Sequence, residues 1–195
     1  MNFQKLLVLV LACAITAMPT TIYTSTDVPK TTDPTSLTSI IDVPDSLLLT
    51  DVNVTLNMDV FFGENMDMFL TSPSGTEVQL FNENCGANEN IVMTFDDEAA
   101  QGLGACGDTN AASGLAFQPF QALSAFDGQD AFGVWTFRAV DTFGSTGDAT
   151  LRSLSLELSG SSAPPIPEPA TFGAAALGLL SLAAIGYRRR RRQDK

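Results

Sequence analysis

Apolar and polar residues alternate along several short stretches of the chain, with the two-residue period of a strand that buries one face. Residues 52–58 show this most regularly, with valine, leucine or methionine at every second position and asparagine or threonine between. The alternation predicts strands at residues 38–43, 52–58, 66–70, 77–81, 91–95, 133–140 and 154–158. No segment between residues 47 and 160 has helical periodicity. Many short strands separated by Gly, Pro and Asn turns predict an all-β sandwich.

The amino-terminal segment has a different pattern. One lysine, Lys5, precedes an apolar run that continues to Met18, and small residues offer a cleavage site after Ala17. This is the order of a secretory signal peptide, so we expect residues 1–17 to be a signal-peptide helix that is later removed. The sequence Val10-Leu11-Ala12-Cys13 loosely resembles a lipoprotein lipidation site, which is the alternative. Both interpretations predict an exported chain.

The carboxyl-terminal segment has three parts in order. Pro167-Glu168-Pro169 precedes an uncharged apolar run at residues 170–187. A helix of that length spans about 27 Å and can cross a bilayer. The basic cluster that follows consists of Arg188, Arg189, Arg190, Arg191 and Arg192, and such a cluster stays on the cytoplasmic side.

This order resembles the PEP-CTERM sorting signal of Gram-negative bacteria, over residues 167–192. The resemblance implies that a membrane-embedded exosortase-type enzyme cuts near the Pro-Glu-Pro motif. The protein would then be anchored transiently in the inner membrane and afterwards reach the cell surface or the extracellular space. An ordinary carboxyl-terminal membrane anchor is the alternative.

The body between the two ends is strongly acidic. Residues 18–167 contain three basic residues, Lys30, Arg138 and Arg152, and 20 of the 22 acidic residues of the chain, a formal net charge of −17. Phosphate binding needs a cationic surface, so nucleic acid is excluded as a partner. Divalent cations are favoured, because carboxylate oxygens are abundant. The alternative is that the acids only keep an exported surface soluble.

Two cysteines, Cys85 and Cys106, remain after Cys13 leaves with the signal peptide. A pair of cysteines in an exported domain predicts a disulfide. The loop that it closes, of about 22 residues, corresponds to about 3 kcal/mol of stabilisation in the loop-entropy account. The chain contains no histidine, so this pair is a poor basis for a zinc site.

Several ordered blocks of the body resemble the P domain, also called the Homo B domain, of proprotein convertases and bacterial subtilisin-like proteases. The blocks are residues 51–57, 66–76 with the turn Leu70-Thr71-Ser72-Pro73-Ser74-Gly75-Thr76, 95–99, 123–136 and 154–158. The resemblance implies a jelly-roll β-sandwich of the galactose-binding-like kind at residues 25–159, followed by a linker at residues 160–166. Phe132-Gly133-Val134-Trp135 departs from the usual Asn-Gly-Thr-Trp turn, and the region of the two cysteines looks like a local elaboration.

P domains usually follow a protease and stabilise it, but this chain is not expected to be an enzyme. A Ser-His-Asp triad needs an imidazole base, and no histidine is present. Lys30 is the one lysine of the body, which gives a Ser-Lys pair little support. A peptidase label would therefore come only from the domain family.

The acidic residues of the matched blocks suggest a calcium site instead. Calcium takes six to eight oxygen ligands, and we expect it to draw on some of Asp67, Asp96, Asp97, Asp127 and Asp130. The spacing is not that of an EF-hand. Paired carboxylates could also serve a glycosidase, but Asp96 and Asp97 are adjacent and point to opposite faces of a strand. No other cofactor is expected.

Trp135 alternates with Phe137 and Ala139, which predicts a core position, and a sugar-stacking surface is the alternative. We expect a surface or matrix protein that binds extracellular polysaccharide or an envelope protein. The first alternative is an accessory domain that acts on a separate exported protease, and the second is a carbohydrate-active enzyme.

Overall fold

The computed structural model describes residues 20–31, 35–60, 62–86, 90–106, 114–144 and 149–162. The chain divides into two compact units, Met1–Ser162 and Ala163–Lys195. The predicted signal peptide at residues 1–17 and the sorting signal at residues 167–192 lie outside the described residues. Within the described ranges, no helix is long and apolar enough to span a membrane.

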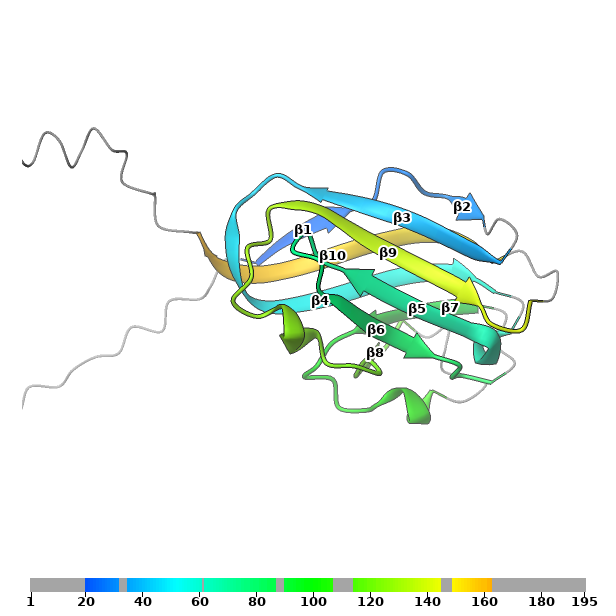
Figure 1. Cartoon of the computed structure of the whole chain (residues 1–195). Helices are drawn as coiled ribbons and strands as arrows, with labels where there is room; N and C mark the ends of the chain where they lie inside the picture. The colour runs from blue at the N-terminus through cyan, green and yellow to red at the C-terminus, as the bar shows by residue number, and fades with distance from the viewer. Residues whose placement is uncertain are drawn as a thin grey trace, which may run out of the picture. The chain divides into compact units, whose positions relative to one another are not determined.

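The described part is built almost entirely from strands, with three short 3₁₀ helices (Figure 1). In chain order the elements are β1 (Thr20–Thr24), β2 (Lys30–Thr31), β3 (Ser36–Val43), β4 (Leu47–Asp59), η1 (Gly63–Asn65), β5 (Met66–Thr71), β6 (Glu77–Asn82), β7 (Asn90–Phe95), η2 (Leu103–Ala105), β8 (Ala116–Phe117), η3 (Leu123–Phe126), β9 (Gly133–Asp141) and β10 (Thr150–Ser162). The all-β prediction is confirmed.

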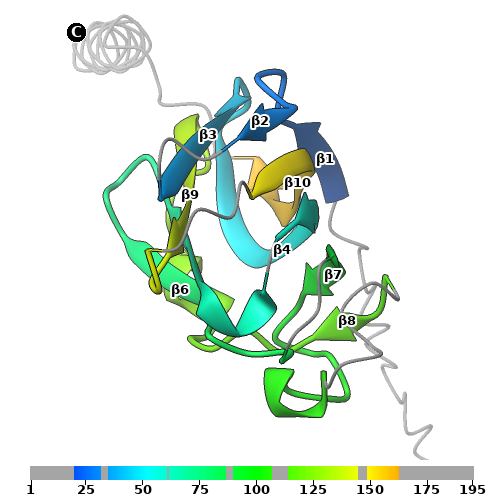
Figure 2. The ribbon, with the colours of Figure 1, turned by 90° about the vertical axis from the view of Figure 1, so that its right-hand side faces the viewer.

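The strands form two sheets that face each other (Figure 2). The six-stranded sheet has the order β1-β10-β4-β7-β8, with β2 also paired to β10, and the four-stranded sheet has the order β3-β9-β5-β6. All pairs are antiparallel except β7 with β8. Except for the hairpin of β5 and β6, most neighbours in each sheet are far apart in sequence, so the fold depends on long-range pairing.

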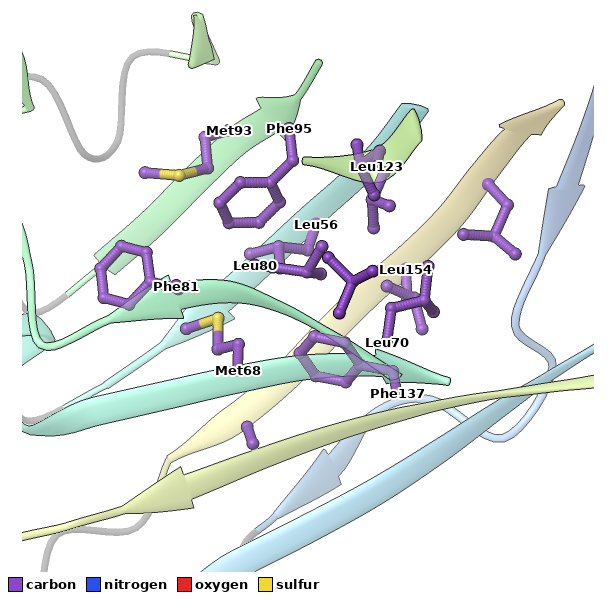
Figure 3. Close-up of a cluster of buried hydrophobic side chains, with 14 of the residues drawn as sticks. Leu56, Met68, Leu70, Leu80, Phe81, Met93, Phe95, Leu123, Phe137 and Leu154 are labelled. Carbon is purple, nitrogen blue, oxygen red and sulfur yellow. The ribbon is translucent and has the colours of Figure 1, made fainter. Parts of the chain in front are cut away.

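The hydrophobic core lies between the two sheets (Figure 3). The six-stranded sheet contributes Leu56, Met93, Phe95 and Leu154, the four-stranded sheet contributes Met68, Leu70, Leu80, Phe81 and Phe137, and η3 contributes Leu123. The rings of Phe81 and Phe95 meet edge to face across the sheets, with centroids 6.4 Å apart. The alternation in sequence therefore became alternation between the core and the surface, as the strand period requires.

Two expected boundaries are wrong. The linker was expected at residues 160–166, yet Gly160, Ser161 and Ser162 continue β10, paired with Leu49, Leu48 and Leu47 of β4. The domain was expected to begin at residue 25, yet Thr20–Thr24 already forms the edge strand β1. Both segments are rich in Ser and Thr, which resembles a linker in composition, and long-range pairing with a neighbouring strand overrides that local impression.

Gly160 fits the β10 extension because it has no side chain. A β-carbon added there would lie 2.5 Å from the carbonyl oxygen of Leu48. The register between β10 and β4 shifts at this point, between Ser159 and Gly160. Close approach of two backbones at a bulge is a common reason for glycine in a strand.

A polar cluster around Asp27 ties the segment after β1 to β3. The Asp27 carboxylate accepts hydrogen bonds from the hydroxyls of Ser25 at 2.6 Å and Ser39 at 2.5 Å. Its second oxygen accepts one from the Lys30 ammonium at 2.8 Å. Ser25 and Ser39 are both buried and lie 2.9 Å apart. Burial alone would raise the pKa of Asp27, but donation from Lys30 and the two serines lowers it well below its usual value.

We expect Asp27→Asn to destabilise the domain by about 2 kcal/mol at pH 7, because it removes a charged acceptor from buried donors. The folded-state pKa of Asp27 lies below the unfolded-state value. Its contribution is therefore present above about pH 4 and is lost as the pH falls towards the folded-state value. Urea unfolding at pH 7 and pH 3 measures this, and the gap between wild type and variant should narrow at pH 3. An equal gap at both pH values would contradict it.

Candidate functional site

The loops at one end of the sandwich are joined through the side chain of Gln129. Its carbonyl oxygen accepts hydrogen bonds from the hydroxyls of Ser72 at 2.8 Å and Ser74 at 2.5 Å. Its amide nitrogen donates to Thr76 Oγ1 and to the carbonyl of Ala125, both at 2.9 Å. All four hydrogen-bonding positions of one carboxamide are thus used, and the Ser-Pro-Ser-Gly-Thr turn is fixed against η3. The sequence did not predict this role of Gln129, because the turn that it contacts is more than 50 positions away and the neighbouring acids were interpreted as calcium ligands.

The turn before β9 is fixed by a second contact at the same end. Gly133 has a φ of +125°, and a β-carbon there would lie 2.9 Å from the β-carbon of Pro73. A non-glycine residue would meet both backbone strain and this clash. Next to it, Trp135 is 1% exposed and donates its indole N–H to the carbonyl of Ala131 at 2.9 Å. The core position predicted for Trp135 is confirmed.

The predicted disulfide is present, which confirms the pairing of the two cysteines. Cys85 and Cys106 are bonded, their α-carbons are 5.0 Å apart and 21 positions separate them in sequence. Both residues are buried. The bond joins the turn after β6 to the end of η2 and so restrains two loop segments.

Three of the five predicted calcium ligands lie apart or are already committed. Asp67 is on β5 of the four-stranded sheet, where its carboxylate accepts from Asn82 at 3.3 Å. The Asp97 carboxylate caps η3, accepting the backbone N–H of Leu123 at 2.9 Å and of Ser124 at 2.8 Å. Asp130 accepts from the hydroxyl of Ser46 at 2.9 Å. These carboxylates therefore serve the fold locally.

Asp51 lies near the carboxylates of Asp96, Asp127 and Glu157. Burial raises the pKa of Asp51, and the nearby charges of Asp96, Asp127 and Glu157 raise it further. Burial and the charge of Asp97 also raise the pKa of Asp127. Mutual repulsion of this kind is relieved by a bound cation or by protonation. Asp51 was not among the predicted ligands, because its position in the sequence beside a predicted strand has no spacing that is typical of a metal site.

The five predicted ligands do not form one cluster. Within the ranges that the structure describes, no group of three or more acidic or cysteine side chains is arranged to hold a metal ion. A surface cavity of about 310 Å³ adjoins one of them and is lined by Asp97, Gln118, Pro119 and Ala122. Both oxygens of the Asp97 carboxylate in this cavity accept backbone hydrogen bonds.

Calcium binding stays a prediction, which a thermal melt can test. We expect the melting temperature in millimolar calcium to be a few degrees higher than in chelator. A calcium concentration of about ten times the dissociation constant stabilises the folded state by about 1.4 kcal/mol. Magnesium is the matched control and should have a smaller effect, because it demands stricter octahedral geometry. The same melting temperature in calcium and in chelator would remove calcium from the description.

Lys30 and two serine hydroxyl groups meet at the carboxylate of Asp27. Lys30 Nζ donates to Asp27, and the hydroxyls of Ser25 and Ser39 donate to the same carboxylate or bond to each other. Among the described residues, no serine hydroxyl is bonded to Lys30. A serine nucleophile needs a base to accept its proton, and the ammonium group is held here as an ion pair.

The predicted sorting residues cannot be placed in this geometry. Pro167, Glu168, Pro169 and the arginine cluster at residues 188–192 lie outside the described part of the chain. Their assignment rests on the comparison with known families.

Comparison with solved structures gives distant likenesses. A crystal structure of the Aeromonas sobria serine protease with its chaperone matches at 15% identity and a TM-score of 0.44, covering 75% of this chain and 27% of that chain. A structure of the serine protease of Aeromonas sobria matches at 16% identity and a TM-score of 0.43, covering 73% and 26%. The chain spans about a quarter of the length of these proteases. No curated protein matches the chain.

Family models match two consecutive segments. Residues 49–158 match the proprotein convertase P-domain, and residues 165–192 match the PEP-CTERM protein-sorting motif. The first match covers more than half of the 195 residues. It contains every block on which the resemblance rested, and the second match follows it in the expected order. The chain therefore belongs to the proprotein convertase P-domain family and carries a PEP-CTERM sorting motif after that domain.

Proposed function

We propose that this chain is a non-catalytic P-domain protein, sorted to the cell envelope or the exopolysaccharide matrix, where it acts as a binding and structural module. The observation that carries the proposal is a P domain followed directly by a sorting motif. A PEP-CTERM motif marks an exported protein of Gram-negative bacteria and implies processing by an exosortase. What reaches the surface would then be the acidic β domain, with or without its membrane segment.

The chemistry of the domain supports a role without catalysis. The chain has no histidine, and Lys30 is paired with Asp27. The carboxylates Asp97 and Asp130 are occupied by hydrogen bonds within the fold. A binding role needs only a stable sandwich and an exposed surface, and each sheet has an exposed outer face.

We assign the domain to the jelly-roll β-sandwiches, of the galactose-binding-like kind. The strand order supports this, since eight main strands form two sheets of four, β1-β10-β4-β7 and β3-β9-β5-β6. Consecutive strands pass repeatedly from one sheet to the other, and the first and last strands are neighbours. A double Greek key has this kind of connectivity, which supports the assignment.

The sorting half of the proposal is tested by following the full chain in the bacterium that produces it. The wild-type protein should be found in the outer envelope or matrix fraction. A variant with alanine at Pro167, Glu168 and Pro169 should remain in the inner membrane, because the processing enzyme no longer recognises it. A variant that distributes like the wild type would remove the exosortase from the proposal.

The binding half is tested by retention of the protein on extracellular polysaccharide from the same bacterium, in calcium and in chelator. Retention in either buffer would support a matrix module, and a difference between the buffers would assign the acidic residues a role. If the protein is retained in neither buffer, the polysaccharide matrix is not the partner.

A second candidate is an accessory domain that stabilises a separate exported serine protease. The family to which the chain belongs favours it, since P domains are named for the proprotein convertases that contain them. Such a role requires a stable complex in trans. Recovery of an exported protease with the tagged chain after mild crosslinking would support it, and recovery of the chain alone would not.

A further inference from the structure

The outer face of the four-stranded sheet, which we call the Arg138 face, combines apolar and planar polar side chains. Alternate residues of β9 point outward from the core, so Val134 is 49% exposed while Trp135 is 1% exposed. Ile40 of β3 is 44% exposed and is a diagonal neighbour of Val134, since Ile40 is opposite Thr136 and Val134 is opposite Asp42. Phe132, just before β9, is 60% exposed. Figure 2 shows β3, β9 and β6 together on one side of the sandwich.

Arg138 lies beside this apolar strip, in the middle of the sheet. Its guanidinium carbon is 4.0 Å from the centroid of the Phe69 ring on β5. Its distance to the carboxylate of Glu77 on β6 is 3.5 Å, at the long end of an ion pair, and both side chains are more than a third exposed. A stacked guanidinium is held flat and presents its fork of donors in a fixed direction. Glu77 and Gln79 on β6 add planar acceptors and donors beside it.

The charges around this face limit what can bind. Arg138 is paired with the carboxylate of Glu77 on β6 and interacts electrostatically with that of Asp67 on β5. Asp42 on β3 is opposite Val134, at the other end of the same face. The other two basic residues of the body, Lys30 and Arg152, are paired with Asp27 and Asp59. A polyanion would meet repulsion from these carboxylates and from the net charge of −17. A suitable ligand is therefore not a polyanion, and the guanidinium of Arg138 beside the carboxylate of Glu77 suits a ligand that carries both hydrogen-bond donors and acceptors.

We propose that the Arg138 face binds a neutral, hydroxyl-rich polysaccharide. A pyranose ring has adjacent hydroxyl pairs, which planar side chains such as Arg138 and Glu77 can bind through two hydrogen bonds each. It also has an apolar C–H side, which can cover Val134 and Ile40 and remove them from water. The inference rests on the proposed matrix function and names the class of ligand and the surface that takes it.

The experiment uses the full chain, purified in a mild detergent, in affinity gels that contain dextran, laminarin or galactomannan as neutral probes and alginate as the anionic probe. We expect retardation by at least one neutral polysaccharide and none by alginate. Arg138→Ala and Val134→Ser should each weaken binding about tenfold. Circular dichroism and thermal unfolding confirm that each variant is folded.

Two control variants make similar chemical changes on the other sheet: each removes an arginine or an exposed β-branched aliphatic side chain. Arg152→Ala removes an exposed arginine that pairs with Asp59, and Ile22→Ser removes a residue of β1 that is 63% exposed. Both should bind as the wild type does. Equal weakening by the control variants, stronger binding to alginate, or no binding to any neutral probe would overturn the assignment. If the protein is still retained on whole matrix in those cases, the matrix function survives while this surface and ligand class do not.

Discussion

Replacing Trp135 by alanine is expected to destabilise the domain by about 4 kcal/mol, the largest effect of any substitution considered. The indole is 1% exposed and meets the ring of Phe126 edge to face, with centroids 5.0 Å apart. Removal leaves a large cavity between β9 and η3. It also leaves the carbonyl of Ala131 without the N–H that it accepts at 2.9 Å. An unsatisfied buried acceptor adds to the cost of the cavity.

Urea unfolding followed by far-ultraviolet circular dichroism measures this loss without relying on tryptophan fluorescence. With a slope of about 1–3 kcal/mol per molar urea, the midpoint should fall by about 2 M. Trp135→Phe keeps most of the apolar volume and should cost less than half as much. Phe143→Ala is the control, because Phe143 is 74% exposed and should change stability by less than about 0.5 kcal/mol. A loss below 1 kcal/mol for Trp135→Ala would mean that the indole is not part of the core.

Removing the disulfide is the second large effect. The double substitution of Cys85 and Cys106 by alanine is expected to cost about 3 kcal/mol, since the bond closes a loop of 21 positions. Part of the effect arises in the unfolded chain, which gains conformations when the crosslink is absent. Both sulfurs are buried, so alanine is preferred to serine, which would add hydroxyl groups to an apolar site.

Chemical reduction provides the internal control for this prediction. The wild-type protein in excess reductant should unfold at the same urea concentration as the double variant, and the double variant should be insensitive to reductant. The bond restrains the β6–β7 turn and the end of η2. Protease sensitivity in the reduced protein should therefore appear first in these loops. Wild-type protein that unfolds identically with and without reductant would show that the bond contributes no stability.

The alternation of apolar residues predicted the strands of the core well. Residues 52–58 and 154–158 became the centres of β4 and β10, which pair with each other across the six-stranded sheet. Their side chains alternate between core and solvent because strand geometry imposes that period on any sequence. Strands without strong alternation were missed, namely β1, β2 and β8. They are short edge elements whose stability comes from a neighbouring strand.

The candidate site could be predicted less well than the fold. The sequence indicated that acidic residues are abundant, but it did not predict that Asp51 lies near Asp96 and Asp127. Asp97 caps the 3₁₀ helix η3, and Asp67 on β5 lies in the opposite sheet from Asp51 on β4. Side-chain partners of this kind depend on where strands and loops meet in space. The spacing of acids in sequence carries no such information unless a loop is short enough to hold them together.

By itself, the sequence determined the carboxyl-terminal sorting motif, the family, the disulfide pair and the core position of Trp135. These follow from composition, local period and motif order, which do not depend on long-range contacts. Only the tertiary structure showed that Gln129 is hydrogen-bonded to Ser72, Ser74 and Thr76, which precede it by 53 to 57 positions in the sequence. It also decided that Gly160 must pass close to Leu48 and that Arg138 stacks on Phe69. Each depends on the register between strands distant in sequence, which is set by packing of the whole core.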